Sequence, residues 1–205
     1  MTARSYHHGD LRNALLAATM ELVGERGARG FSVSEAARRA GVSISAPYRH
    51  FADRDAMLAA AAQSGFAELE TRLRDLAATL GVEQTFGACA AQLAVLYVDF
   101  ALENPPRFEV MFAPGLEKAT QPELLEQTVD VQSLLELALA PHLEREQLSS
   151  RAAELWALAH GVATLSIGGG LGHAIGDASP GDIVARAARS WSSGVADDAA
   201  LARKG

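Results

Sequence analysis

The chain has 205 residues, 49% of them hydrophobic, with a formal net charge of −7 and a pI of about 5.4. This length is enough for a substantial core, built either as one compact body or as two small units that share an interface. The acidity excludes a general nucleic-acid coat. No apolar run reaches the roughly 20 residues that cross a bilayer, and the N-terminus lacks the apolar core of a signal peptide, so we expect a cytoplasmic protein without a membrane partner.

Charge and composition vary along the chain. Residues 1–60 hold eight arginines and six acidic residues, a net charge of +2, whereas the remainder holds 10 basic and 19 acidic residues, a net charge of −9. A mildly basic first part beside an acidic remainder can orient on DNA. The chain is rich in alanine and leucine, which favour packed helices over sheets, so we predict an all-α fold.

Two predicted helices precede Gly41. The first runs from about residue 9 to residue 27 and carries apolar side chains on one face. The second starts at Ser32, whose hydroxyl can accept from the Glu35 amide while the Glu35 carboxylate reaches back to the Ser32 amide, a capping box. Gly41 ends it, because the turn needs a positive φ that costs other residues energy. The apolar face of the first helix consists of Leu11, Leu15, Ala18 and Leu22.

The segment after Gly41 predicts another short helix, from about Ile44 to Phe51, with Ser43 as its cap. Pro47 has no amide to donate to the Ser43 carbonyl, a local defect that other caps or 3₁₀ geometry could absorb. Small and apolar side chains at the start would let the backbone approach the floor of a DNA major groove, and later residues supply donors for phosphates. Helix–glycine–helix is the pattern of a helix-turn-helix, although packing alone would produce it about half the time.

Two separated motifs resemble the TetR family of one-component transcriptional regulators. Tyr48-Arg49-His50-Phe51, followed by Asp53-Arg54-Asp55, is similar to the end of the DNA-binding head in that family. Farther along, Trp156 to Gly161 is similar to the tryptophan and His-Gly pair of the WHG-type C-terminal domain that some members carry. The run from Glu103 to Phe112 is similar to the same subgroup.

The resemblance divides the chain and implies its first candidate site. It implies a three-helix DNA-binding head with a helix-turn-helix over residues 1–54, and a helical ligand-binding and dimerisation body over residues 55–205. The head would contact DNA mostly through phosphates, whereas base choice would rest on the small and apolar residues that start the second short helix. The DNA-binding candidates are Ser32, Ser43, Ile44, Ser45, Ala46, Tyr48, His50 and Arg54.

Prolines, glycines and caps place the remaining predicted helices. Asn104-Pro105-Pro106 forces a break, because proline lacks an amide donor and restricts the residue before it. Pro141 stops another helix, and Ser179-Pro180-Gly181-Asp182 combines a cap, a proline at the first helical position and an acid in the first turn. The predicted helices span about residues 54–80, 83–103, 108–112, 122–140, 150–167 and 180–200.

The resemblance also implies a dimer and a small-molecule pocket in the body. The last two long helices would pair with their copies through Ala152 to Thr164 and Ile183 to Val195, including Trp191, although these faces could equally be monomer core. Twofold symmetry then implies a near-palindromic operator, with recognition helices roughly 34 Å apart. A pocket needs apolar walls with a few polar groups, and ordinary core packing is the commoner role for each single candidate. The ligand-binding candidates are Tyr97, Phe100, Phe108, Met111, Phe112, Trp156 and His160.

The sequence gives little support for catalysis, a metal site or a cofactor. Cys89 is the only cysteine and is predicted to be a small core residue. The histidines lack a compact ligand spacing with cysteine or carboxylates. An enzyme that used His160 with Asp99 or Glu103 would need a motif that brings these groups together, and none is present.

We therefore predict a sequence-specific DNA-binding transcriptional regulator, a homodimeric repressor that an unidentified small-molecule effector releases from double-stranded operator DNA. The alternative is a dimeric helical interaction module without sequence-specific DNA binding.

Overall fold

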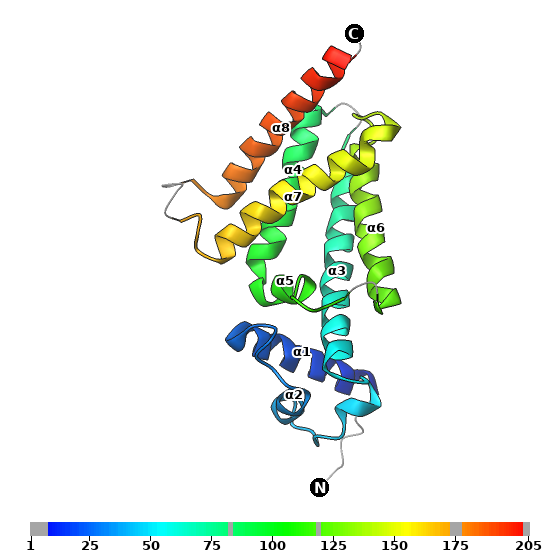
Figure 1. Cartoon of the computed structure of the whole chain (residues 1–205), viewed down its shortest axis with the longest axis vertical. Helices are drawn as coiled ribbons and strands as arrows, with labels where there is room; N and C mark the ends of the chain where they lie inside the picture. The colour runs from blue at the N-terminus through cyan, green and yellow to red at the C-terminus, as the bar shows by residue number, and fades with distance from the viewer. Residues whose placement is uncertain (1–7, 82–83, 118–119, 173–177, 203–205) are drawn as a thin grey trace. The chain divides into compact units, whose positions relative to one another are not determined.

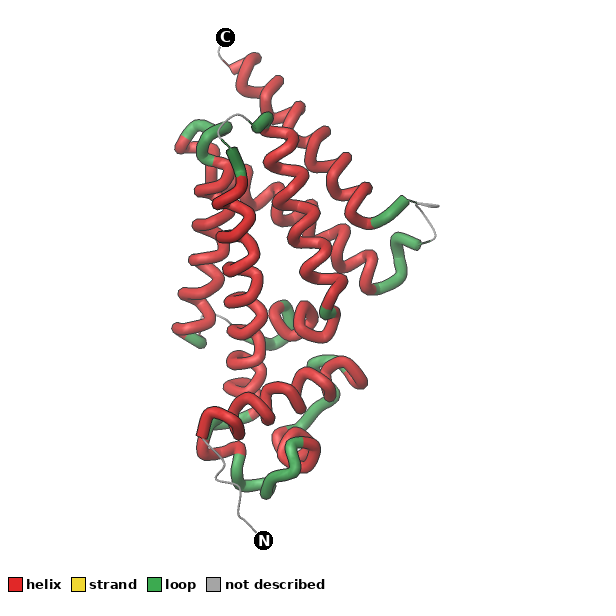
Figure 2. Tube along the Cα trace, turned by 180° about the vertical axis from the view of Figure 1, so that it is seen from behind, coloured by secondary structure: helices red, strands yellow, loops and turns green. Residues whose placement is uncertain are grey.

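The computed structural model describes residues 8–81, 84–117, 120–172 and 178–202, and the regular elements within these ranges are all helical (Figure 2). The predicted all-α fold is therefore confirmed. In chain order, the α-helices of the described ranges are α1 (His8–Arg26), α2 (Val33–Arg39), α3 (Arg54–Thr79), α4 (Phe86–Glu103), α5 (Pro105–Met111), α6 (Pro122–Leu139), α7 (Leu148–Ile167) and α8 (Pro180–Ala202).

The helices group into two compact units. The first unit contains the described residues up to 67 together with those of 104–128, and the second contains those of 68–103 together with those from 129 onwards. Helices α3 and α6 contribute to both units, so the division falls within these two helices and also between α4 and α5. The domain boundary at residue 54 remains a prediction.

The core of the first unit forms around the apolar face of α1. Leu15, Ala18 and Leu22 are buried, as their spacing predicts. Helix α2 packs on α1 and buries Ala36 and Ala37, whose small side chains allow the two helices to approach closely. Helix α5 also packs on α1, so the first unit includes an element from far along the chain.

The second unit is organised around α4, which packs against α7 and α8 (Figure 1). Cys89, Ala94 and Val98 of α4 are buried there, and α7 and α8 pack on each other as well. Among the described helices, α4 is long and apolar enough to span a membrane by length and composition, and half of that stretch is buried inside the protein. Packing in the core of the second unit accounts for its apolar character.

Most predicted helix ends lie within three residues of the observed ones. At the start of α8, Ser179 Oγ accepts from the Asp182 amide at 3.0 Å and donates to the Asp182 carboxylate at 2.8 Å, which confirms the predicted cap. Helix α5 starts earlier than predicted, at Pro105, because Asn104 Oδ1 accepts from the Arg107 amide at 3.2 Å. Prolines suit the first helical positions, where amides lack helical partners in any case.

Candidate functional site

The start of α2 is fixed by the predicted capping box. The Glu35 amide donates to Ser32 Oγ at 3.3 Å, and the Ser32 amide donates to Glu35 Oε2 at 3.1 Å. Ser32 Oγ also donates to Glu35 Oε2 at 2.8 Å, and Arg26 pairs with Glu35 Oε1 at 2.7 Å. The hydrogen bond from the Ser32 hydroxyl, and next that from Arg26, hold the pKa of Glu35 below its ordinary value. The carboxylate that completes the cap is therefore ionised at neutral pH.

Gly41 turns the chain after α2, as predicted. Its φ is 71°, a backbone conformation that glycine adopts without strain. The Val42 amide then donates to the Ala37 carbonyl at 3.0 Å, which closes the C-terminal end of the helix.

The segment from Ser43 to Phe51 differs from the prediction. It contains a single 3₁₀ turn, Pro47–Arg49, rather than an α-helix from Ile44 to Phe51. Ser43 was the predicted cap, but the 3₁₀ turn has no side-chain cap, and Ser43 Oγ lies 3.2 Å from Ser45 Oγ. Both predictions, the α-helix and its cap, are therefore wrong.

Pro47 explains this difference. It has no amide hydrogen for the Ser43 carbonyl, which accepts instead from the Ala46 amide, three residues along, at 3.0 Å. The Arg49 amide bonds to the Ala46 carbonyl at 3.2 Å and the His50 amide to the Pro47 carbonyl at 2.8 Å, again at a separation of three. This is the bonding of a 3₁₀ turn, the tighter of the two helical geometries.

The same segment contains both exposed side chains and two buried residues. Pro47 and Phe51 are buried, and Arg12 of α1 lies over the Phe51 ring, with Cζ 5.6 Å from its centroid. In contrast, Ile44 and Tyr48 are 60% and 59% exposed, so both side chains are accessible to a partner. Of the other DNA-binding candidates in this segment, Ser43 and Ser45 are exposed, and Ala46 and His50 are half-buried.

Two DNA-binding candidates make bonds inside the first unit. Ser32 serves the capping box. Arg54 Nε donates to the Phe31 carbonyl at 3.2 Å, its Nη2 donates to the Ala28 carbonyl, and its Cζ lies 4.9 Å from the centroid of the Phe31 ring. Arg54 thus ties the first residue of α3 to the turn between α1 and α2.

Three ligand-binding candidates form a hydrogen-bonded cluster in the second unit. Trp156 Nε1 donates to Tyr97 Oη at 3.1 Å, and Tyr97 Oη lies 2.9 Å from His160 Nδ1. Because an indole nitrogen only donates, the Tyr97 hydroxyl accepts from Trp156 and can direct its own hydrogen to His160. Burial raises the pKa of Tyr97, so the phenol stays protonated. Trp156 is 41% exposed, so the cluster reaches the surface of the unit.

The other four ligand-binding candidates lie elsewhere. Phe108, Met111 and Phe112 belong to α5 and its end in the first unit, where the Phe112 ring packs edge-on against Phe66 with centroids 5.7 Å apart. Phe100 belongs to the second unit, where it is buried beneath the guanidinium of Arg72. The seven candidates are therefore divided between the two units, and their contact with a ligand stays a prediction.

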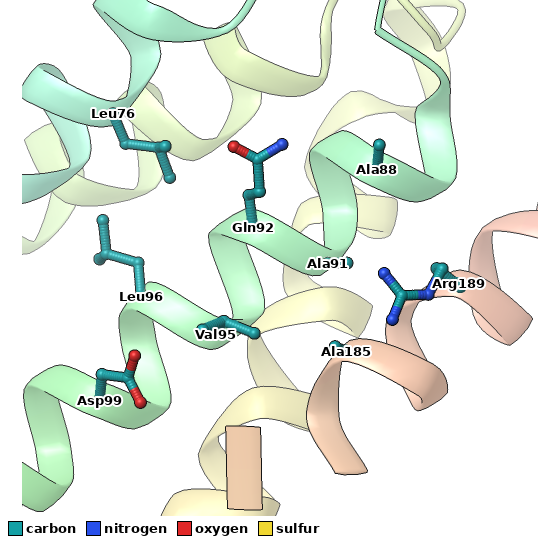
Figure 3. A pocket seen from close by; sticks show the side chains of 9 residues that line it. All are labelled: Leu76, Ala88, Ala91, Gln92, Val95, Leu96, Asp99, Ala185 and Arg189. Atoms are coloured by element: carbon teal, nitrogen blue, oxygen red, sulfur yellow. The ribbon is translucent and has the colours of Figure 1, made fainter. Parts of the chain in front are cut away.

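A groove that the sequence analysis missed runs along α4 in the second unit (Figure 3). Its volume is about 430 Å³, and none of the seven ligand-binding candidates lines it. Asp99 stands on its α4 wall, and burial, followed by the charge of Glu103, raises the pKa of this carboxyl. Helical spacing on α4 was the available signal, since six lining residues recur three or four apart on one face. The lining residues are Leu76, Ala88, Ala91, Gln92, Val95, Leu96, Asp99, Ala185 and Arg189.

The two predicted interface surfaces are partly buried within a single chain. Their inward residues are core of the second unit, where α7 and α8 pack on α4. Trp191 Nε1 donates to Glu154 at 2.8 Å, which links α8 to α7. The outward residues, such as Trp156 and Thr164, are exposed. The buried residues of these surfaces are Ala152, Leu155, Ala159, Ala163, Val184, Ala188, Ser192 and Val195.

Cys89 is buried in α4, as predicted for a core residue, and burial raises the pKa of its thiol to about 11. Over the described residues, no three histidine, cysteine or acidic side chains gather in a way that could hold a metal ion.

Comparison with protein families gives two matches in the order of the chain. Residues 15–61 match the bacterial regulatory proteins of the tetR family, and residues 90–190 match the tetracyclin repressor-like C-terminal domain. Together the two matches cover well over half of the chain. The chain belongs to the TetR family. As a member of this family it is a DNA-binding transcriptional regulator; the finer WHG-type description of its C-terminal part stays a prediction.

Solved structures resemble this TetR family protein over nearly its whole length. A protein of unknown function from Rhodococcus sp. RHA1 is 31% identical, with a TM-score of 0.75 over 94% of this chain and 98% of that one. The TetR family transcriptional regulator PfmR from Thermus thermophilus is 16% identical, with a TM-score of 0.61 over 89% and 93%.

A third solved structure shares the fold at low identity. FadR from Bacillus subtilis, solved in complex with stearoyl-CoA, is 12% identical, with a TM-score of 0.67 over 88% of this chain and 96% of that one. Comparison with curated proteins gave no match.

Proposed function

We propose that this TetR family regulator is a homodimeric repressor that leaves a near-palindromic operator when a small molecule binds its second unit. The observation that carries the proposal is the exposed segment after α2, where Ile44 and Tyr48 face solvent above the buried Pro47 and Phe51. Small and apolar side chains at an exposed turn let the backbone approach the floor of a DNA groove, where base edges and the thymine methyl group can be contacted.

Within this segment we propose a division of roles. Ile44, Ser45 and Ala46 meet base edges, because their short side chains let the backbone come close. The Tyr48 hydroxyl, His50 and the hydroxyl of Ser43 bind phosphates and set the register on the duplex. For Ser32 and Arg54 we propose that any phosphate contact is secondary to the bonds that hold the first unit together.

The Tyr48 prediction is tested by substituting that residue. Tyr48→Phe removes one phosphate donor and keeps the ring, so we expect operator affinity to fall by about fivefold, the loss of roughly one hydrogen bond. Fluorescence anisotropy with a labelled duplex measures the change, and urea unfolding shows that the fold is intact. Thr79→Val, which also removes an exposed hydroxyl but lies in the second unit, is the control. Equal affinities for Tyr48→Phe and the unsubstituted chain would remove Tyr48 from the interface.

For the effector site we favour the cluster of Tyr97, Trp156 and His160. It combines aromatic walls with polar groups and reaches the surface at Trp156, which are the properties of a small-molecule site. The groove along α4 is the second place for an effector, with Asp99 and Arg189 as its charged groups. An effector at the cluster would change the fluorescence of Trp156, and His160→Ala would abolish that change; an effector in the groove would instead be sensitive to Arg189→Ala.

The proposed control is a coupling between two equilibria. DNA and effector would weaken the binding of each other, because each favours a different arrangement of the dimer. The coupling must come from different effector affinities in the two arrangements rather than from occupancy alone. The regulator would act in the cytoplasm, without catalysis, cofactor or membrane partner.

Selection of duplexes from random DNA by the purified chain tests this proposal. We expect one near-palindromic sequence. Its half-sites should be separated by about 10 base pairs or a multiple of this, because twofold symmetry presents two equal surfaces to the same side of the duplex. Enrichment of a single half-site would contradict the dimer, and no enrichment would favour the alternative of an interaction module.

A further inference from the structure

The turn between α1 and α2 is held from both sides of one residue, Ala28. The Ala28 amide donates to Oε1 of Glu109, a residue of α5 that lies 81 positions later, at 2.8 Å. The Ala28 carbonyl accepts from Nη2 of Arg54, the first residue of α3. Ala28 is 3% exposed, so its amide and carbonyl need partners within the protein, and distant side chains supply both.

The electrostatics of this arrangement are favourable at both ends of Ala28. A carboxylate faces its amide, which carries partial positive charge, and a guanidinium faces its carbonyl, which carries partial negative charge. Hydrogen bonds to ionised groups are shorter and about twice as strong as those between neutral groups. Glu109 and Arg54 therefore fix the position of Ala28 more firmly than neutral partners would.

The geometry of the turn depends on close approach to Glu109. Gly27 has a φ of 75°, and a Cβ at this position would lie 3.1 Å from Glu109 Oε1. The Gly27 amide donates to the Val23 carbonyl at 2.7 Å, just after α1 ends at Arg26 and one residue before Ala28. The chain thus leaves α1 at Arg26 and meets the Glu109 carboxylate two residues later, at the Ala28 amide.

Helix α5 is closely fitted to the other helices of the first unit. A Cβ at Gly24 of α1 would come within 2.9 Å of Pro106 Cγ, and a Cβ at Gly65 of α3 within 2.6 Å of Met111 Sδ. Both glycines are places where helices approach more closely than a methyl group allows. Helix α5 therefore has a fixed position relative to α1 and to the first part of α3, with Glu109 between these two contacts.

We propose that Glu109 is a positioning residue for DNA recognition. Its carboxylate holds the Ala28 peptide, Arg54 holds the same residue and Phe31 from the other side, and Ser32 starts α2 directly after Phe31. The position of α2, and hence of the exposed segment that follows Gly41, is set through these bonds by α5. This inference rests on the proposed function only for its DNA readout.

The DNA readout compares Glu109→Ala, Glu109→Gln and Glu117→Ala. Glu117 is also exposed, and among the described residues its carboxylate has no hydrogen bond or ion pair, so it matches the charge change without the contact. We expect Glu109→Ala to weaken binding to the selected operator by about tenfold, the effect of losing one charged hydrogen bond. Glu109→Gln keeps an acceptor oxygen and retains most of the affinity, while Glu117→Ala binds at least as well as the unsubstituted chain.

Two features of this readout separate positioning from other effects. Removing an acidic charge favours DNA binding by itself, so a weaker affinity cannot arise from the charge change. Affinity for random duplex does not fall under the proposal, because phosphate contacts tolerate a shifted surface while base contacts do not. Equal loss on operator and random DNA, or the same loss in Glu117→Ala, would overturn the proposal.

A second measurement needs no DNA. Amide hydrogen exchange of Ala28, followed by NMR, is expected to be about tenfold faster in Glu109→Ala and unchanged in Glu117→Ala, because only the first loses the acceptor. If Glu109→Ala does not fold, Glu109→Asp withdraws the carboxylate by one methylene and serves in its place. Unchanged exchange at Ala28 would overturn the proposal even if an operator is found. Faster exchange in a chain that selects no operator would support the hydrogen bond between Ala28 and Glu109 and would show that the proposed function is wrong.

Discussion

At the scale of single residues, Ser32 serves two bonds with one hydroxyl, since it accepts from the Glu35 amide and donates to the Glu35 carboxylate. We expect Ser32→Ala to lower the free energy of unfolding by about 1 kcal/mol, the usual effect of removing an N-cap side chain. Urea unfolding measures this effect, with Ser45→Ala as a control at an exposed hydroxyl outside α2. A control that destabilised the chain as much as Ser32→Ala would show that the cap is not the cause.

The rate at which the buried thiol of Cys89 is alkylated is expected to depend on pH. Burial raises the pKa of its thiol to about 11, and the reactive thiolate forms only as the pH approaches that value. Alkylation of the folded chain at about pH 7 is therefore expected to be slow and to accelerate as the pH rises, whereas in urea the thiol regains an ordinary pKa and reacts readily. Mass spectrometry follows the reaction; the same rate with and without urea would contradict the burial of Cys89.

Whether the role of a residue could be predicted from the sequence depends on how far along the chain its bonded partner lies. The capping box joins residues three apart, so the sequence alone indicates it. Arg54 and Glu109 bond to a turn that lies 26 and 81 positions away. Such contacts depend on which helices pack together, and a charged residue in the sequence gives no sign of a distant backbone partner.

At the scale of elements, prolines predict several helix ends correctly, whereas at one position the helix predicted around a proline is wrong. Asn104-Pro105-Pro106 and Pro141 mark helix ends that the structure confirms to within a few residues. At Pro47 the same missing amide converts an expected α-helix into a 3₁₀ turn. The sequence shows the defect but not its outcome, because a short helix can absorb a missing amide either through other caps or through 3₁₀ geometry.

The conformation of this segment can be tested by Pro47→Ala. The substitution restores an amide that can donate to the Ser43 carbonyl, so we expect α-helical Cα chemical shifts to extend over residues 44–49. Pro122→Ala is the matched control, because Pro122 is the first residue of α6, where an amide has no helical partner. Unchanged shifts in Pro47→Ala would mean that packing, and not the missing amide, sets the 3₁₀ turn.

At the scale of the whole molecule, the family and the all-α fold follow from local motifs, whereas the sites do not. Tyr97 and His160 are hydrogen-bonded although 63 positions separate them, and α5 belongs to the first unit although it follows α4. The aromatic residues of one predicted pocket are consequently divided between two units. Apolar spacing identifies the inward face of a helix but not the helix that covers it.

Recognition of one DNA sequence by the chain is tested most directly by two affinities, one for the selected operator and one for a shuffled duplex of equal length. Both are measured at one physiological salt concentration. We expect a ratio of about a thousandfold or more, the range of sequence-specific regulators. Both affinities should fall as salt rises, because phosphate contacts release counterions. A ratio near one across the salt series would contradict the account.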